Sequence, residues 1–292
     1  MQDMLPLGFP AELNVLCSTG PMARSYRDLH LFMTTLKSSS QHLTDPLVVP
    51  IPWSLSPPIP KPICLGIMLT DGAITPQPPV LAALAWAQEK LQHHSSTFTL
   101  KPFIPYKAAQ AITNIGTAYW PDNGLTTRSS LASTGEPEHP LTTSCLAPVS
   151  IPTTPRREKA ATEITSLRLT RDAYRAAFLA SYNAQEIDFV LCPCYVGPAS
   201  KHDQALFWNY TALWNYLDYP AVVFPTPYTT TGREEYAADY EPLSERCRVT
   251  KEQWDEGGYE GAPINLQLVG RRWCDSEVMG VLGELQKVFG FA

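Results

Sequence analysis

Short apolar runs alternate along this chain with longer segments of helical periodicity. The runs at 188–192 and 221–224 are stopped by Pro193 and Pro225, so neither continues as a helix and both predict short strands. Between them lie a loop and an aromatic-rich helix. Loops at strand ends are the usual carriers of ligand-binding groups, because the sheet holds them in place while their side chains stay accessible.

The same pattern predicts two further pairs of a strand and a helix. A strand over 64–69 ends at a polar turn, and a helix begins after the prolines at 78–79. A last strand over 264–269 is followed by a helix that we expect Asp275 to cap. Strands that alternate with helices place the chain in the α/β class.

Three other segments have the spacing of amphipathic helices. A capping box at 25–28 precedes apolar residues at positions 29, 32, 33 and 36. A second helix is predicted over 106–118. A long third one runs from about 156 to 183, with Leu167, Tyr174, Phe178 and Ser181 facing inward.

The remaining segments read as loops. Turn signals mark a long irregular region between 119 and 155. The Pro-rich stretch 46–62 around Trp53 predicts an extended, ordered loop. Acidic residues dominate 226–262, which predicts a solvated surface excursion.

Charge and cysteine content narrow the function classes. The net charge is −6 over 292 residues, which gives no basic field for nucleic acid. No apolar run approaches the roughly 20 residues of a membrane span. Residues 1–10 carry no secretion pattern, so we expect a cytoplasmic protein with reduced thiols. Cys192 and Cys194 are a weak metal signal, so structural cysteines are favoured over zinc, and we expect neither a metal nor a cofactor.

The best local cluster of reactive groups is 200–203, Ser-Lys-His-Asp. Nucleophilic catalysis needs the base within about 3 Å of the hydroxyl, and consecutive side chains point apart in regular backbone. The favoured interpretation is that Asp203 caps the next helix while His202 bonds a loop carbonyl. No complete catalytic signature occurs in the chain.

An aromatic set follows this cluster and has two possible uses. It could line an apolar substrate pocket, or it could pack into the core, which is the more frequent use of such a stripe. Both uses stay open for different members. The set comprises Phe207, Trp208, Tyr210, Trp214, Tyr216 and Tyr219.

Several blocks, in the same order, resemble fungal acetamidase-like members of the amidase signature family, and the resemblance covers nearly all of the chain from about residue 14. It implies an α/β fold with a mixed sheet flanked by helices. The blocks are 19–25 (TGPMARS), 69–72 (LTDG), 78–79 (PP), 119–124 (YWPDNG), 133–137 (STGEP), 201–203 (KHD), 214–220 (WNYLDYP) and 261–271 (GAPINLQLVGR).

The resemblance implies a carboxylic amide hydrolase that uses a serine nucleophile, a bridging serine and a neutral lysine. In that family the lysine and a Gly-Ser-rich loop lie upstream of the TGPMAR block, where this chain has only residues 1–18, and none of these match. The whole of 1–292 therefore resembles the C-terminal part of an amidase domain, with an incomplete fold. No residue inherits a catalytic role, so we expect no activity from this chain alone.

Part of a substrate pocket can survive without the catalytic segment. Six residues lie near that pocket by their positions in the resemblance: Asp71, Gly72, His202, Asp203, Trp208 and Trp214. For each of them, helix capping or core packing is the alternative interpretation.

Exposed strand edges and apolar helix faces would favour self-association, or a partner chain that supplies the missing half and so completes a site for a small-molecule amide. A non-catalytic accessory or binding protein in a fungal metabolic or biosynthetic pathway is the alternative function.

Overall fold

The fold is built on a five-stranded mixed sheet. The computed structural model describes residues 14–16, 20–46, 48–54, 56–147 and 159–292. Within them the strand order is β2-β1-β3-β5-β4, with β1 parallel to β2 and β3, and β5 antiparallel to β3 and β4. The strands are β1 (Ile63–Ile67), β2 (Phe98–Pro102), β3 (Phe189–Pro193), β4 (Ala221–Thr229) and β5 (Pro263–Val269). The expected α/β class with a mixed sheet flanked by helices is confirmed.

The two edge strands differ from the sequence prediction. β2 was not predicted, because its five residues include Thr99 and Lys101 and form no apolar run. β4 continues through Pro225 to Thr229, although that proline was expected to end it. Among the described strands β4 pairs only with β5, so it is an edge strand, where proline is tolerated because the missing N–H takes nothing from a ladder.

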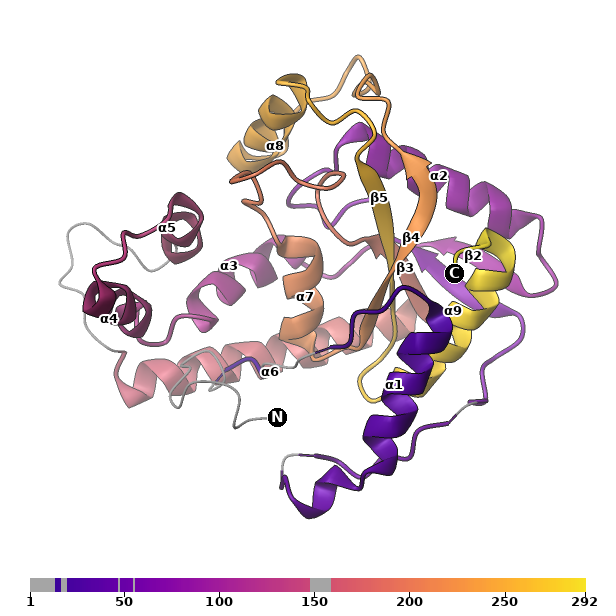
Figure 1. Cartoon of the computed structure of the whole chain (residues 1–292), viewed down its shortest axis with the longest axis horizontal. Helices are drawn as coiled ribbons and strands as arrows, with labels where there is room; N and C mark the ends of the chain where they lie inside the picture. Colours follow the sequence, from indigo (N-terminus) through magenta and orange to yellow (C-terminus); the bar gives the residue numbers. More distant parts are fainter. Residues whose placement is uncertain (1–13, 17–19, 47, 55, 148–158) are drawn as a thin grey trace.

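One face of the sheet is covered by α3 (Ala108–Ala118), α6 (Ala161–Ala184) and α7 (Asn209–Leu217) (Figure 1). Their interface is aromatic. Phe178 of α6 lies edge-on to Trp214 of α7, with ring centroids 6.1 Å apart. Tyr174 and Tyr182 are buried beside it. The inward face predicted for the long helix is thus confirmed at Tyr174 and Phe178, whereas Leu167 and Ser181 are only half-buried and Tyr182 is buried instead.

The opposite face is covered by α2 (Pro78–Gln92) and α9 (Asp275–Phe289), and α1 (Tyr26–Ser38) packs on the outside of α9. The predicted cap of α1 is confirmed, because Ser25 Oγ accepts a hydrogen bond from Asp28 N. The predicted cap of α9 is wrong by one residue: Cys274 is the N-cap and Asp275 is the first helical residue. α1 has no fully buried residue, and its Leu31 and Phe32 are exposed.

Short helices occupy segments that the sequence predicted as irregular. The region after 119 contains α4 (Leu125–Thr134) and α5 (Pro140–Leu146), while positions 148–155 lie outside the described residues. The Asp122 carboxylate accepts from Gly124 N and Thr126 N and thereby holds the start of α4. Such a helix depends on one local cap rather than on an apolar stripe, so the periodicity missed it.

The polar segment 226–262 is only partly a solvated excursion. It contains the end of β4 and also α8 (Glu245–Asp255), which buries Cys247, Thr250, Gln253 and Trp254. Because the outer side of α8 is charged, the amino-acid composition of this segment did not indicate its buried face.

The Pro-rich segment forms no helix or strand at its described positions. Trp53 lies edge-on to His30 of α1 and packs against the core cluster to which α9 contributes. A single turn, η3 (Gln41–Leu43), precedes it. Within the residues that the structure describes, no helix combines the length and apolar character that a membrane crossing needs.

Candidate functional site

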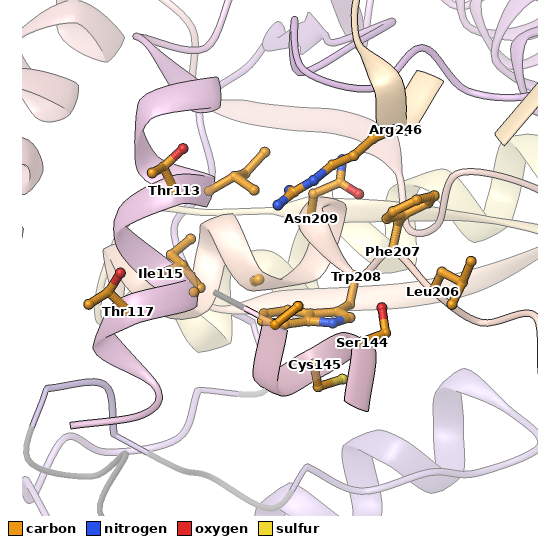
Figure 2. Close-up of a pocket in the computed structure, with 14 residues that line it drawn as sticks. Thr113, Ile115, Thr117, Ser144, Cys145, Leu206, Phe207, Trp208, Asn209 and Arg246 are labelled. Atoms are coloured by element: carbon orange, nitrogen blue, oxygen red, sulfur yellow. The ribbon is translucent and has the colours of Figure 1, made fainter. Parts of the chain in front are cut away.

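A cavity of about 420 Å³ opens between α3, α5, α8 and the loop that leads into α7. Figure 2 shows α3 on one side, α5 below, and the loop residues opposite. The lining residues are Ile112, Thr113, Ile115, Gly116, Thr117, Ser144, Cys145, Ala147, Leu206, Phe207, Trp208, Asn209, Ala212 and Arg246.

The walls of the cavity are mainly apolar. Ile115 of α3 faces Phe207 and Trp208 of the loop, and Ile112 lines the same cavity. Trp208 is held by Tyr119, whose ring centroid lies 5.2 Å away. Serine, threonine and cysteine side chains add small polar groups, and Arg246 is the one charged residue among the described lining residues. An apolar cavity with a few polar groups is the usual form of a small-molecule site.

A buried hydrogen-bond network connects the floor of this cavity, formed by Asn209, to the turn after β1. Asp71, 3% exposed, follows β1, and its Oδ1 accepts from Ala73 N and Ile74 N, each at 2.9 Å. Its Oδ2 accepts from Asn209 Nδ2 at 2.5 Å. The Tyr210 hydroxyl donates to Ile74 O at 2.6 Å. The turn after β1 therefore positions the first residues of α7 and, through them, the cavity wall.

The loops after the parallel strands β1 and β3 are joined beside this network. Gln77 N donates to Val196 O at 2.7 Å, and Gln77 Nε2 donates to Thr250 O of α8 at 3.0 Å. Gly197 lies so close to Gln77 that a Cβ at this position would overlap Gln77 Oε1. Glycine therefore permits the close approach of the two loops, and a larger residue would have to push the Gln77 side chain aside.

The Ser-Lys-His-Asp cluster forms no catalytic relay. Ser200 Oγ donates to Lys201 O, the Lys201 amine donates to Gly257 O at 3.0 Å, and His202 is exposed. Asp203 does not cap α7 as expected, because that helix starts six residues later with Trp208 at its N-cap. Asp203 has positive φ and its carboxylate instead pairs with His139 Nε2 at 3.2 Å.

This pairing leaves His139 unsuited to act as a base. Its Nδ1 accepts from Leu141 N at 3.1 Å, at the start of α5, and its Nε2 faces Asp203. Both ring nitrogens are engaged, so the residue links α5 to the loop instead of activating a nucleophile. Among the positions described, no serine hydroxyl is hydrogen-bonded to a histidine ring or a lysine amine.

Of the two close cysteines, Cys192 is buried and Cys194 is half-buried. Burial raises the pKa of Cys192 to about 12, and burial raises the pKa of Cys194 to about 11. Gln267 Nε2 donates to Cys192 Sγ at 3.4 Å, and Cys194 Sγ donates to Asn265 O at 3.3 Å. Neither group is a nucleophilic thiolate at neutral pH.

The aromatic set divides between the two uses that the sequence left open. Tyr210, Trp214 and Tyr216 lie in the core, each 1% exposed, whereas Phe207 and Trp208 line the cavity. Tyr219 packs on the core from its edge. The aromatic side chains of α7 therefore pack into the core, whereas those of the loop before it line the cavity.

The six residues proposed from the sequence lie at different places around this site. Trp208 lines the cavity, Asp71 bonds to its floor, and Trp214 lies in the core beneath. Gly72 is exposed with φ of 75°. His202 and Asp203 lie on the exposed loop that reaches α5 through His139.

Sequence reasoning missed Asn209 and Arg246. Asn209 is buried, with 4% exposed, and lies at the start of α7, where neither the apolar periodicity nor the family blocks marked it. Arg246 belongs to a helix that was not predicted, so no pattern pointed to it. Only the packing of α8 against the loop brings the two residues to one cavity.

A family model for amidases matches residues 8–279 of this chain. The chain belongs to the amidase family. "Putative amidase C550.07" of Schizosaccharomyces pombe is 34% identical over 272 residues, which cover 93% of this chain and 50% of that relative. The acetamidase of Aspergillus oryzae is 24% identical over 284 residues, which cover 93% of this chain and 51% of that protein.

The solved structures agree with this amidase assignment. A fatty acid amide hydrolase superposes with a TM-score of 0.83 at 27% identity, covering 93% of this chain and 48% of that one. A second structure, an amidase, has a TM-score of 0.57 at 16% identity and supports the fold alone. The resemblance read from the sequence blocks is confirmed, and the chain spans about half the length of the amidases it matches.

Proposed function

We propose that this chain is the substrate-holding half of a carboxylic amide C–N hydrolase and that it does not hydrolyse amides alone. The observation that carries the proposal is that the amidase relatives are about twice as long as the part this chain matches. Within the described positions no serine is paired with a base, which supports the same conclusion.

The absent half would have to supply the chemistry. In this proposal it brings the serine nucleophile, the bridging serine and the neutral lysine that the family resemblance implies. Residues that act as one catalytic unit lose most of the rate when they are removed together. A chain without them binds an amide but gives it no attacking oxygen.

In this proposal the cavity holds the part of the amide that does not react. Trp208 contacts the substrate directly. Asp71 acts through Asn209, and Gly72 allows the turn that places them. His202 and Asp203 fix the loop at the cavity edge, and Trp214 supports Trp208 from the core.

The open edge of β4 is the surface that we assign to the absent half or to a second copy of this chain. In the described part of the chain β4 has a partner strand on one side only, and Val223 near its start is 45% exposed. An unpaired edge with an apolar side chain favours the addition of another strand.

We also propose a cytoplasmic location. The six described cysteines are all free, which is the state expected in a reducing compartment.

A non-catalytic binding protein is the second candidate. It is favoured by the cavity, whose described lining already combines apolar walls with a few polar groups, the usual form of a small-molecule site. Under this alternative the chain binds a small molecule in a metabolic or biosynthetic pathway and needs no complementary half.

Ammonia release distinguishes these possibilities. The purified chain is incubated with acetamide and with benzamide, and ammonia is compared with a heat-killed control. We expect no release from the chain alone. Ammonia above that control, if it is lost in a Ser200→Ala variant, would overturn the predicted inactivity.

A second arm tests the role of the complementary half. The chain is co-expressed with the half of the Schizosaccharomyces pombe relative that it does not match. Copurification with ammonia release supports the half-enzyme proposal. Amide binding without copurification favours the binding protein.

A further inference from the structure

We propose that the cavity selects an amide whose non-reacting end carries a carboxylate, and that Arg246 recognises this carboxylate. The inference rests on the proposed function of the cavity as the substrate site. It adds the chemical class of the ligand.

The charge of the cavity is the first observation. Its described lining contains one cation, Arg246, and no aspartate, glutamate or lysine. Figure 2 shows the Arg246 side chain reaching from α8 across the cavity, above Asn209 and toward the α3 wall. A ligand with one negative charge at that end would leave the occupied cavity neutral.

The pairing of the neighbouring cations is the second observation. α8 carries three basic residues, and two of them pair with carboxylates of the same helix. Arg248 pairs with Glu245 and Glu252, and Lys251 pairs with Asp255. The Arg246 guanidinium makes no hydrogen bond or ion pair with the described residues. It is therefore available to a ligand.

The surroundings of Arg246 strengthen such a contact. Arg246 is exposed in the free chain, but Phe207 and Ile112 line the same space, so a ligand seated there would displace part of the water around its carboxylate. Coulomb attraction increases as the effective dielectric constant falls. A guanidinium matches a carboxylate with two parallel N–H donors, which gives orientation as well as affinity.

An unpaired acceptor in the cavity floor is the third observation. Asn209 is 4% exposed and lines the cavity, and its Oδ1 has no partner among the described residues. A buried acceptor without a partner costs free energy that a ligand donor recovers. A hydrogen-bond donor on the non-reacting part of the ligand, beside its carboxylate, would match both Asn209 and Arg246.

Two probes that differ by one charge test this inference. Adipamate has an amide at one end and a carboxylate at the other, and adipamide has the same length with an amide at both ends. Binding is measured by ¹H–¹⁵N chemical-shift titration. The Trp208 indole N–H, assigned through a Trp208→Phe variant, reports occupancy of the cavity.

We expect adipamate to bind the unmodified chain about tenfold more tightly than adipamide, the size of a charge-assisted hydrogen-bonded contact at a partly exposed site. In Arg246→Gln the two affinities become equal while that for adipamide stays unchanged. Arg248→Gln is the matched control, because it removes a cation two residues away on the same helix, and it keeps the tenfold ratio.

Each contradicting result of these titrations overturns a different part of the inference. If both probes bind equally to the unmodified chain, the carboxylate preference is overturned and the amide site stands. If the tenfold ratio survives in Arg246→Gln, the assignment of Arg246 is overturned. If neither probe shifts the Trp208 signal, both this inference and the cavity's place in the proposed function are overturned.

Discussion

Removing the Asp71 carboxylate tests how the turn after β1 holds the cavity floor. In Asp71→Ala three donors lose their acceptor, namely Ala73 N, Ile74 N and Asn209 Nδ2. Ala73 is half-buried and its N–H can reach water, whereas Ile74 and Asn209 are buried and cannot. Two buried donors that lose a charged acceptor cost about 1.5 kcal/mol or more each, so we expect a loss of about 3 kcal/mol in the free energy of unfolding.

The variant Asp71→Asn separates hydrogen bonding from charge. Its amide oxygen still accepts from Ala73 N and Ile74 N. Its amide nitrogen faces Asn209, whose side chain can rotate so that the Oδ1 that now lacks a described partner becomes the acceptor. All three contacts are thereby replaced, so we expect a loss of about 1 kcal/mol or less.

Urea unfolding followed by tryptophan fluorescence measures both variants, with equal m values required before midpoints are compared. The control is Asp239→Ala, which removes an exposed carboxylate and should change stability by less than about 0.5 kcal/mol. The reasoning is refuted if Asp71→Ala costs no more than the control, or if Asp71→Asn costs as much as Asp71→Ala.

Three further predictions follow from other contacts. Gly197→Ala should cost about 2 kcal/mol, measured by urea unfolding, because the new Cβ displaces Gln77 from its bond to Thr250 O; an unchanged midpoint would contradict it. Val223→Lys should leave the melting temperature unchanged and abolish self-association in analytical ultracentrifugation, whereas a compact monomer of the unmodified chain would count against association through β4. Burial opposes ionisation of Asp122, but hydrogen bonds from Thr126 and Gly124 lower its pKa below the ordinary value. Its contribution to stability is therefore full above about pH 4 and is lost as the pH falls through the lowered pKa. The melting temperatures of the unmodified chain and of Asp122→Asn should differ most near pH 6 and become equal toward pH 3. A difference that does not change with pH would contradict the link between Asp122 ionisation and stability.

The order of strands and helices was available from the sequence wherever a segment carried its own signal. The apolar run at 188–192 predicted β3, and the capping box at Ser25 predicted the start of α1. The order of the matching blocks predicted the amidase fold and its half-length extent. These signals are local in sequence, because burial on both faces of a strand or one face of a helix leaves a period that can be read directly.

Tertiary structure alone decided the edges of the sheet and the cavity. β4 continues through Pro225 because it lies at an edge, and sheet order is not encoded in the strand itself. α8 is recognisable only after it packs, since one buried face among many charges leaves a weak pattern. Arg246, Asn209 and Trp208 come from separate segments, and their convergence on one cavity is a property of packing that spacing along the chain does not specify.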